Sequence, residues 1–491
     1  MITAKINDVH LQYVDSVLLK VRTEPGILME LSEEFTYFAQ GYKFSPKFRN
    51  RVWDGKIRLI NSMTGLCYAG LAKRIKKFCD SRGYTLSFDH ELAYDNISVK
   101  EVEDFIATLG VPFEVRDYQV DSVVKCLRSR RRTLESPTSS GKSLMIYILT
   151  QWYKQHKALI IVPTIGLVKQ MEGDIRSYGY KGNIHVSTDG LSKDNDIPCD
   201  VAITTWQSLN NGKTKMPKTW YNQFGVVIGD EAHGAKATSL IQILSSLSNC
   251  HYRFGTTGTL DGDPLNEATI EGLFGPKYKA VTTKQLMDQG HVSKLKIKCI
   301  VLKYPEEVCK IVHEKGRTYN DEVDTLVNLP QRNTFIKNLT LSLKGNKLLF
   351  FRMIDHGRNL HKLIVDSGAN SYYIDGSVSG DNRESIRHAI EDEENAIIIA
   401  SLGTTSTGVS INKLHHMIAA SPSKSKIKVL QSIGRMLRLH EQKDVAILYD
   451  IVDDMTYKSK ANFTLNHFIE RTKIYDQEQF DYEIYNVKIK I

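Results

Sequence analysis

Short apolar runs alternate with amphipathic stretches from about Pro112 onward in this 491-residue chain. The four clearest runs are "ALIIVP" (158–163), "DVAITT" (200–205), "FGVVIGD" (224–230) and "YRFGTTG" (252–258). Apolar runs of this length, bounded by turn or polar residues, are typical of strands buried on both faces of a parallel sheet. The stretches between them, such as 144–156 and 165–179, suit crossover helices. The pattern predicts a doubly wound α/β domain.

A second series of the same kind begins near Gly345. Its runs are "KLLFFRM" (347–353), "SYYIDG" (371–376), "NAIIIAS" (395–401), "HMIAAS" (416–421) and "VAILYDIV" (445–452). Two series of similar size predict two α/β lobes, and a nucleotide between the lobes is one expectation. The final "FDYEIYNVKIKI" alternates as a closing strand does. We expect four regions, namely 1–110, 111–280 (lobe 1), 281–455 (lobe 2) and a C-terminal extension over 456–491.

The bulk composition is that of a globular protein, with 41% apolar and 25% charged residues. Intrinsic disorder and a fibrous fold are therefore disfavoured. The seven cysteines are scattered and form no CxxC pair, which favours reduced thiols over a disulfide framework or a zinc site. The formal net charge of +9 raises the odds of a polyanionic partner.

The N-terminus carries no apolar signal core, and no run reaches the roughly 20 apolar residues that a membrane span needs. We therefore expect a cytoplasmic protein without a membrane partner.

The first 110 residues form a different, basic region, for which a small α+β fold is expected. Between Lys43 and Lys77 ten cations face the single acid Asp54, and the cations are Lys43, Lys47, Arg49, Arg51, Lys56, Arg58, Lys73, Arg74, Lys76 and Lys77. The charge predicts contact with nucleic-acid phosphates, most of all by Lys73, Arg74, Lys76 and Lys77. The interleaved rings of Tyr42, Phe44, Phe48, Trp53 and Tyr68 have two interpretations, base stacking and core packing, and we favour core packing.

The stretch "ESPTSSGKS" (135–143) resembles a phosphate-binding loop that has lost glycines. It follows a short extended segment and opens an apolar helix, which places backbone N–H groups and the positive end of the helix dipole on a phosphate. Pro137, Thr138, Ser139, Ser140 and Gly141 would form the cradle. Lys142 would reach the β- and γ-phosphates, and Ser143 would ligate Mg²⁺. Ser136 and Ser139 replace glycine, which is tolerable if the backbone keeps a negative φ there.

Another tripeptide of the same kind, Gly212-Lys213-Thr214, has no apolar strand directly before it and has Pro217 soon after. We interpret it as a chance match. The cradle at 136–143 gains support from "FGVVIGDEAH", because Asp230 at the end of an apolar run is placed to hold Mg²⁺. Glu231 beside it would polarise the attacking water.

The motifs "SPTSSGKS" (136–143), "DEAH" (230–233) and "QSIGRMLR" (431–438) together resemble those of the superfamily 2 helicases of the DExH type. The resemblance implies two RecA-like lobes and the use of ATP with Mg²⁺. "RDYQ" (116–119) is similar to the adenine-reading element, so Arg116 and Gln119 would contact the base. "GTTGT" (255–259) resembles the element that couples hydrolysis to lobe movement, which implicates Thr257, Thr259 and His233.

Two further motifs of lobe 1, "VPTIGLVKQ" (162–170) and "TTWQSL" (204–209), resemble strand-tracking elements. They imply nucleic-acid contacts by Thr164, Thr205 and Trp206. In lobe 2, Gln431, Arg435 and Arg438 of "QSIGRMLR" lie near one face of a helix entry, and the two arginines would reach the γ-phosphate. "STGVSI" (406–411) matches less tightly, because Ser410 stands where the family often has Asp.

The stretch "YKFSPKFRNRVWDGKIRLI" upstream of these motifs extends the resemblance to phage members of the superfamily. It implies an ATP-driven monomer that unwinds or migrates branched DNA in recombination, repair and replication, in the host cytoplasm. The implied partners are stalled forks, Holliday junctions, D-loops and R-loops, with single- and double-stranded DNA and RNA–DNA hybrids.

Alternatives stay open from the residues alone. They are an RNA helicase, a duplex translocase that separates no strands, the motor of a restriction enzyme, and a nucleic-acid binder with an inactive ATP site.

Overall fold

The computed structural model describes residues 7–187, 198–210, 216–236, 238–378, 382, 385–386, 389–390, 393–402, 413–421, 430, 433–434, 436–437, 439, 443 and 445–490. These residues form two compact units. The first comprises residues 1–136 and 141–280, and the second comprises residues 281–491 with the segment 137–140.

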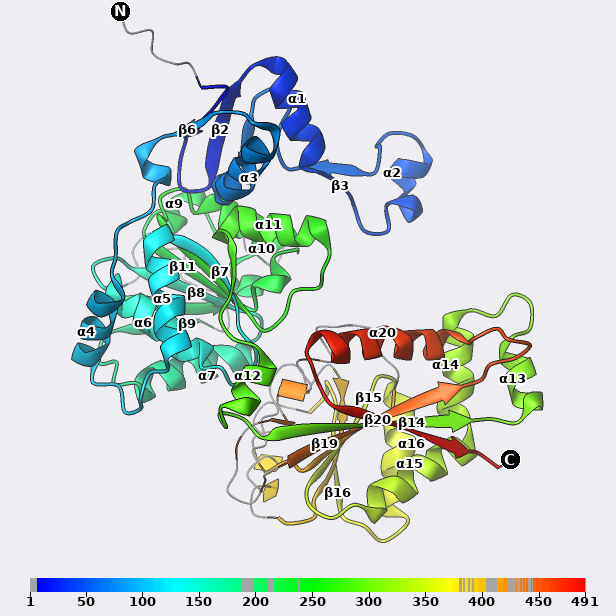
Figure 1. The fold of residues 1–491 in the computed structure, drawn as a ribbon. Coiled ribbons are helices and arrows are strands. Elements are labelled where there is room, and N and C mark those ends of the chain that lie inside the picture. Colours follow the sequence, from blue (N-terminus) through cyan, green and yellow to red (C-terminus); the bar gives the residue numbers. More distant parts are fainter. Residues whose placement is uncertain are drawn as a thin grey trace, which may run out of the picture. The chain divides into compact units, whose positions relative to one another are not determined.

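The N-terminal domain is built on a mixed four-stranded sheet in the order β5-β2-β1-β6 (Figure 1). Its strands are β1 (Val9–Tyr13), β2 (Leu18–Thr23), β5 (Leu66–Tyr68) and β6 (Leu86–Phe88). β1 pairs antiparallel with β2 and parallel with β6. Helices α1 (Pro25–Glu34) and α3 (Ala72–Arg82) supply Leu31 and Ile75 to the core around Val9 and Leu19.

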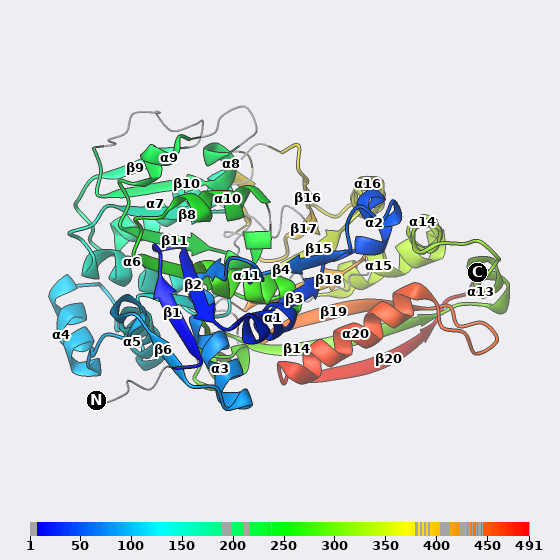
Figure 2. The same cartoon turned by 90° about the horizontal axis from the view of Figure 1, so that it is seen from above.

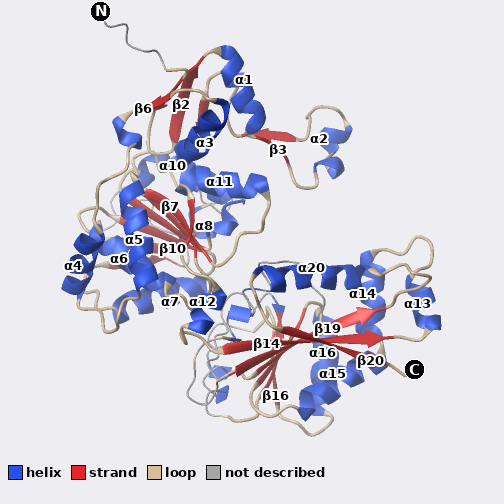
Figure 3. Ribbon diagram, viewed as in Figure 1, coloured by secondary structure: helices blue, strands red, loops and turns tan. Residues whose placement is uncertain are grey.

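A two-stranded arm extends from this domain, as Figure 3 shows. It consists of β3 (Thr36–Phe38), β4 (Lys56–Arg58), the 3-10 turn η1 (Tyr42–Phe44) and helix α2 (Pro46–Arg49). The Phe38 ring stacks on Tyr42 at 4.6 Å, and Phe48 meets the edge of Tyr42 at 4.9 Å. The core interpretation of the rings was wrong for the arm, because Phe44 is 77% exposed and Tyr42, Phe48 and Trp53 are only partly buried. The arm is too small to enclose its own rings.

Lobe 1 is a seven-stranded, fully parallel sheet in the order β13-β7-β12-β11-β8-β10-β9. The strands are β7 (Arg131–Glu135), β8 (Ala158–Val162), β9 (Ile184–Ser187), β10 (Val201–Thr205), β11 (Val226–Asp230), β12 (Tyr252–Thr257) and β13 (Lys277–Lys279). β8 and β10 are buried at every residue, which explains why they contain no polar alternation.

The helices of lobe 1 connect these strands. They are α4 (Val99–Leu109), α5 (Asp117–Ser129), α6 (Lys142–Trp152), α7 (Ile165–Ser177), α8 (Trp206–Leu209), α9 (Lys218–Tyr221), α10 (Thr238–Ser246) and α11 (Pro264–Phe274), with the 3-10 turn η4 (Ala232–Lys236). Two apolar clusters fill the two faces of the sheet, one around Ile160 and Ile146 and the other around Leu159 and Trp220.

Lobe 2 has a second parallel sheet of seven strands, in the order β16-β17-β15-β18-β19-β14-β20. The strands are β14 (Lys294–Lys303), β15 (Lys347–Phe351), β16 (Ser371–Ile374), β17 (Ile397–Ser401), β18 (His416–Ala419), β19 (Val445–Asp454) and β20 (Tyr482–Lys488). The described helices are α12 (Thr283–Asp288), α13 (Glu306–Val312), α14 (Tyr319–Asn328), α15 (Pro330–Ser342), α16 (Ile354–Val365) and α20 (Phe463–Gln477). Figure 2 shows α20 running along the sheet, where it contacts β19.

The predicted fold class is confirmed, with two doubly wound parallel sheets and a small basic α+β domain before them. No helix within the described ranges is long and apolar enough to cross a membrane.

Candidate ATP site and nucleic-acid interface

Three neighbouring strands of lobe 1 deliver the predicted nucleotide-site residues to one edge of the sheet. β7, β12 and β11 are adjacent and parallel, so their carboxyl ends meet at the same edge. β7 leads into the loop 136–141 and helix α6, β11 ends at Asp230, and β12 ends at Thr257. Ligands of open α/β sheets bind at this edge, so the sequence-predicted cradle and acidic pair lie where a nucleotide would bind.

The loop 136–141 is tied to β12 and turns tightly. The Ser136 N–H donates to the Thr257 carbonyl at 2.8 Å, and the Ser140 hydroxyl donates to the Pro137 carbonyl at 2.7 Å. Gly141 has a φ of +80°, which glycine adopts without strain. The expected negative φ at Ser139 was wrong, because its φ is +67°. The loop thus has the left-handed backbone that glycine usually provides, although the residue is serine. This conformation costs a non-glycine residue about 1–2 kcal/mol of folding free energy.

Gln119 lies directly against this loop. The amide Nε2 of Gln119 is 2.2 Å from the position that a Cβ on Gly141 would occupy. The Gln119 Oε1 accepts from the Arg116 N–H at 2.9 Å, which fixes the side chain at the start of α5. Arg116 donates in turn to the Tyr118 hydroxyl at 2.8 Å. The predicted base-reading residues and the predicted phosphate loop therefore lie together.

Lys142 opens α6 and folds back over the loop. Its Nζ donates to the Ser136 carbonyl at 3.1 Å. The positive charge of Lys142 also favours the ionised form of both Asp230 and Glu231, although burial has the larger influence on the pKa of each. The lysine is thus in reach of both halves of the predicted site.

The two threonines that end β12 help to hold the acidic pair, Thr256 directly and Thr257 through His233. The Thr256 hydroxyl donates to Asp230 Oδ1 at 2.6 Å. His233 Nδ1 lies 3.1 Å from Glu231 Oε2 and 3.0 Å from the Thr257 hydroxyl. The Thr257 hydroxyl donates to the Thr259 carbonyl at 3.0 Å. The residues predicted for coupling, His233, Thr257 and Thr259, thus form one chain of contacts beside Glu231.

The two carboxyl groups have opposite pKa shifts. Burial and the neighbouring charge of Glu231 raise the pKa of Asp230. Burial also acts to raise the pKa of Glu231, but the adjacent His233 ring and the charge of Lys142 outweigh it and lower the pKa to about 2. Glu231 is therefore ionised at neutral pH and can accept a hydrogen bond from water.

The donor set suits Mg²⁺, since a serine hydroxyl and a carboxylate are the hard oxygen ligands that this ion prefers beside phosphates. The Ser143 hydroxyl lies 2.7 Å from the Tyr178 hydroxyl. Within the described ranges no group of three or more His, Cys, Asp or Glu side chains forms a metal cluster. These residues therefore fit a site in which Ser143 and Asp230 would be the protein ligands and the nucleotide phosphates would supply the others.

The predicted strand-tracking residues lie at the same edge of the sheet, beyond β11. Thr164 follows β8 and caps α7, accepting from the Leu167 N–H at 3.4 Å. Thr205 ends β10 and caps α8, accepting from the Ser208 N–H at 3.2 Å, and Trp206 follows it. Thr205 is buried, so its hydroxyl acts as a helix cap in this structure.

The basic cluster of the N-terminal domain lies on α3. Ile75, Phe78 and Cys79 face the core, which leaves Lys73, Lys76 and Lys77 exposed on the outer face. Arg74 differs from them, because its guanidinium makes a two-pronged ion pair with Glu271 of lobe 1. Three of the four predicted contacts are thus available at the surface.

Several predicted residues lie outside the described residues, namely Gln431, Arg435, Arg438, Ser410 and the chance match at 212–214. Tyr178 was not predicted. It belongs to none of the helicase motifs in the sequence, and only its place at the end of the helix that follows β8 brings it to Ser143.

Three family models match the chain in order. They are "DNA helicase UvsW, N-terminal" over residues 8–89, "Type III restriction enzyme, res subunit" over residues 112–262 and "Helicase conserved C-terminal domain" over residues 331–440.

Individual proteins match over more of the chain. The "ATP-dependent DNA helicase uvsW" of Enterobacteria phage T4 is 36% identical, covering 98% of this chain and 100% of that protein. The "DNA 3'-5' translocase XPB2" of Sulfurisphaera tokodaii is 25% identical, covering 79% of this chain and 91% of that protein. The crystal structure of T4 UvsW matches with a TM-score of 0.51 and 34% identity, covering 98% of this chain and all of that one.

Proposed function

Because the chain belongs to the family of UvsW-type ATP-dependent DNA helicases, it is an ATP-hydrolysing DNA helicase, and we propose that its substrates are branched DNA molecules. The substrates we propose are stalled forks, Holliday junctions, D-loops and R-loops. The observation that carries the proposal is the basic N-terminal domain, which matches a UvsW model and presents cations on α3 and on the arm. A surface of this kind can hold one duplex arm while the lobes move along a strand.

At the ATP site we propose a role for each residue. Lys142 binds the β- and γ-phosphates, Ser143 and Asp230 hold the Mg²⁺ that neutralises phosphate charge, and Glu231 orients the attacking water. Gln119 reads the adenine edge, with Arg116 beside it. The contacts of Asp230 and Glu231 support these roles. Asp230 accepts from Thr256 of the neighbouring strand β12, and Glu231 lies against His233, which in turn contacts Thr257 of that strand.

The roles of Gln431, Arg435 and Arg438 in binding the γ-phosphate stay predictions, as do a monomeric state, the host cytoplasm as the compartment and the four domain limits. Nucleic-acid contacts by Thr164, Thr205 and Trp206 belong to the same proposal. Their support is the position of all three at the carboxyl edge of β8 and β10.

We would test the function by steady-state ATPase assays at one fixed salt concentration. The chain is assayed with no nucleic acid, single-stranded DNA, duplex DNA, a four-way junction and an RNA–DNA hybrid, and then in strand-displacement assays on the same substrates. We expect the strongest stimulation with the junction. The matched control is Lys142→Ala, which should abolish the stimulated ATPase and leave DNA binding intact. Loss of both would mean that Lys142 is needed for folding.

A second experiment tests the basic surface. Replacing Lys73, Lys76 and Lys77 with Ala should weaken duplex binding, and it should lower the slope of log affinity against log salt by about 0.9 for each phosphate that the protein no longer neutralises. The control replaces Lys100, Lys154 and Lys181, which are exposed on lobe 1 and remove the same charge. Equal slopes in the two triple variants would exclude a specific role for α3.

A second candidate is a duplex translocase that separates no strands. The similarity to the XPB2 translocase favours it over an RNA helicase. Strong stimulation by plain duplex, with no displaced strand on any substrate, would replace our proposal with this one.

A further inference from the structure

The N-terminal domain is docked on lobe 1 by an ion pair between two helices. Arg74 of α3 donates through Nε and Nη2 to the two carboxylate oxygens of Glu271 in α11, at 2.7 and 3.0 Å. The side chains are only 31% and 11% exposed. Figure 1 shows α3 beside α11 within the first unit. Two-pronged pairs of this kind fix orientation as well as distance.

The backbones also approach closely at this junction. A Cβ on Gly70 would lie 2.0 Å from the Glu271 carbonyl oxygen, so only glycine fits there. On the other side the Ser16 N–H donates to the Ser248 carbonyl at 3.1 Å, and Arg131 Nη2 donates to the Ser16 carbonyl at 3.2 Å. The N-terminal domain and lobe 1 are therefore held together at separate points on both sides of the junction.

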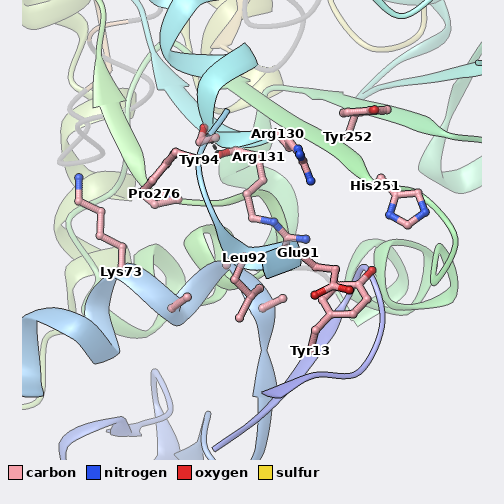
Figure 4. Close-up of a pocket in the computed structure, with 14 residues that line it drawn as sticks. Tyr13, Lys73, Glu91, Leu92, Tyr94, Arg130, Arg131, His251, Tyr252 and Pro276 are labelled. Carbon is pink, nitrogen blue, oxygen red and sulfur yellow. Dashed lines mark hydrogen bonds between the residues drawn. The ribbon is translucent and has the colours of Figure 1, made fainter. Parts of the chain in front are cut away.

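Between these points lies a cavity of about 130 Å³, shown in Figure 4. Tyr13 of the N-terminal domain and Arg131 and His251 of lobe 1 line it, with Lys73 at its margin. Apolar packing at this junction comes from Tyr68, which contacts the apolar clusters of both parts, and the polar contacts add fixed directions around the cavity.

Strand β12 of lobe 1 connects this junction to the ATP site. Arg253 of β12 is fully buried and donates to the carbonyls of Leu273 in α11 and Leu244 in α10, at 2.8 and 2.7 Å. β12 is therefore joined to α11 at Leu273, on the same turn of the helix as Glu271. At its carboxyl end the same strand contacts Asp230 through Thr256.

We propose that the Arg74–Glu271 ion pair makes the basic N-terminal domain move with lobe 1 as one body, and that Arg74 is a positioning residue for strand separation rather than a DNA contact. The proposal rests on the proposed function. A duplex arm held by the N-terminal domain is pulled only as far as the domain follows lobe 1. A loosened junction lets lobe 1 move while the arm stays behind, so ATP is consumed with fewer base pairs separated.

The test measures base pairs displaced per ATP hydrolysed by the full chain. Mutations along such a connection change coupling by about 2- to 30-fold, and we expect a decrease in that range for Arg74→Ala with the DNA-stimulated ATPase retained. Glu271→Ala should have the same effect, and the two changes together should do no more than either alone. The charge-reversed pair Arg74→Glu with Glu271→Arg should restore most of the coupling.

The matched control is Arg82→Ala, because Arg82 lies on the same helix, is exposed and contacts the Phe78 ring of its own domain. It removes the same charge and should leave coupling unchanged. If Arg74→Ala destabilises the chain, Arg74→Lys gives the same comparison, since it keeps the charge and loses the planar fork.

Three results would overturn the inference. The first is that Arg74→Ala displaces as many base pairs per ATP as the unaltered chain. The second is that ATPase and strand separation fall by the same factor. The third is that Arg74→Ala lowers the slope of log DNA affinity against log salt by about 0.9 while Glu271→Ala displaces the normal number of base pairs per ATP, which would make Arg74 a phosphate contact. The proposed function fails separately, if the unaltered chain displaces no strand from any substrate.

Discussion

The hydroxyl groups of Ser143 and Tyr178 lie 2.7 Å apart, which joins the predicted Mg²⁺ ligand to the end of α7. Tyr178 packs edge-on against Phe113 and beside Tyr147, at centroid distances of 5.7 and 5.6 Å. Burial raises the pKa of Tyr178, so the phenol stays neutral at physiological pH. Mg²⁺ would need a lone pair of the Ser143 oxygen, and a hydrogen bond donated by Tyr178 occupies one, so the tyrosine would compete with the metal in that arrangement.

Tyr178→Phe should lower the Mg²⁺ concentration that gives half-maximal ATPase. A hydrogen bond of this kind contributes about 0.5–1.5 kcal/mol, so we expect a shift of roughly 2- to 10-fold. Tyr180→Phe is the matched control, since the Tyr180 hydroxyl donates to Asp200 at 3.3 Å and not to Ser143. A higher Mg²⁺ requirement in Tyr178→Phe would show that the tyrosine assists the ligand instead of competing for it.

Gly141→Ala should weaken ATP binding. The new Cβ would lie 2.2 Å from the Gln119 amide, and an L-residue at a φ of +80° is strained by about 1–2 kcal/mol. We expect KM for ATP to rise about 10-fold or more, and Gln119→Ala in the same chain should relieve the clash but not the strain. Gly173→Ala in α7 is the control, because no atom lies within 4 Å of its Cβ position. ATP titration of the stimulated ATPase measures both, and equal KM values would contradict the geometry.

The coupled carboxyl pair predicts a pH effect. The folded-state pKa of Asp230 is raised, partly by the charge of Glu231, so Asp230 becomes protonated at higher pH than an isolated aspartate. Binding of Mg²⁺–nucleotide should therefore weaken as pH falls through this raised value. Glu231→Gln removes the neighbouring charge, which should move that loss of affinity to lower pH and reduce the hydrolysis rate by about 10²- to 10⁴-fold. Nucleotide affinity measured between pH 4 and 8 checks the shift, and coincident curves would contradict it.

The pKa of Glu231 moves in the opposite direction. It is lowered to about 2 in the folded chain, so its ionised form stabilises the fold above the ordinary value, and this contribution is lost as pH falls through the folded value. His233→Ala should raise the pKa of Glu231, since it removes the ring 3.1 Å away that helps to lower it.

The strands of lobe 1 could be predicted because β8, β10 and β11 are buried on both faces and are apolar over their length. β14 was not predicted, although it has ten residues. Its lysines alternate with apolar residues as in a strand, but it lies beside the limit placed between the lobes and outside both series of continuous apolar runs. The β20 strand could be recognised because most of the final segment alternates polar and apolar residues.

The candidate site also contains residues that local sequence predicts and residues that it does not. The loop, Gln119 and the acidic pair follow from motifs that are short and local. Arg74 looked like its lysine neighbours, because its partner Glu271 lies 197 residues away and only the folded chain brings them together. Ser139 shows the converse, since its residue type gave no sign of a left-handed φ.

Lobe 2 should depend strongly on one buried ion pair. Arg332 and Asp453 have fully buried side chains and meet through two hydrogen bonds of 2.8 and 3.0 Å. Removing one partner leaves the other charge buried and unpaired, so Arg332→Ala should lower the free energy of unfolding by about 3–5 kcal/mol. Arg317→Ala is the control, because its ion pair with Glu314 is exposed and should contribute less than about 1 kcal/mol.

Urea denaturation can assign that loss to one unit. All four tryptophans, Trp53, Trp152, Trp206 and Trp220, lie before residue 281, so their fluorescence follows the first unit, whereas far-ultraviolet circular dichroism follows both. Arg332→Ala should shift the dichroism transition to lower urea and leave the fluorescence transition in place. Arg332→Met with Asp453→Leu should recover much of the loss, since no unpaired charge remains. Fluorescence and dichroism shifting together would mean that the two units unfold as one cooperative body.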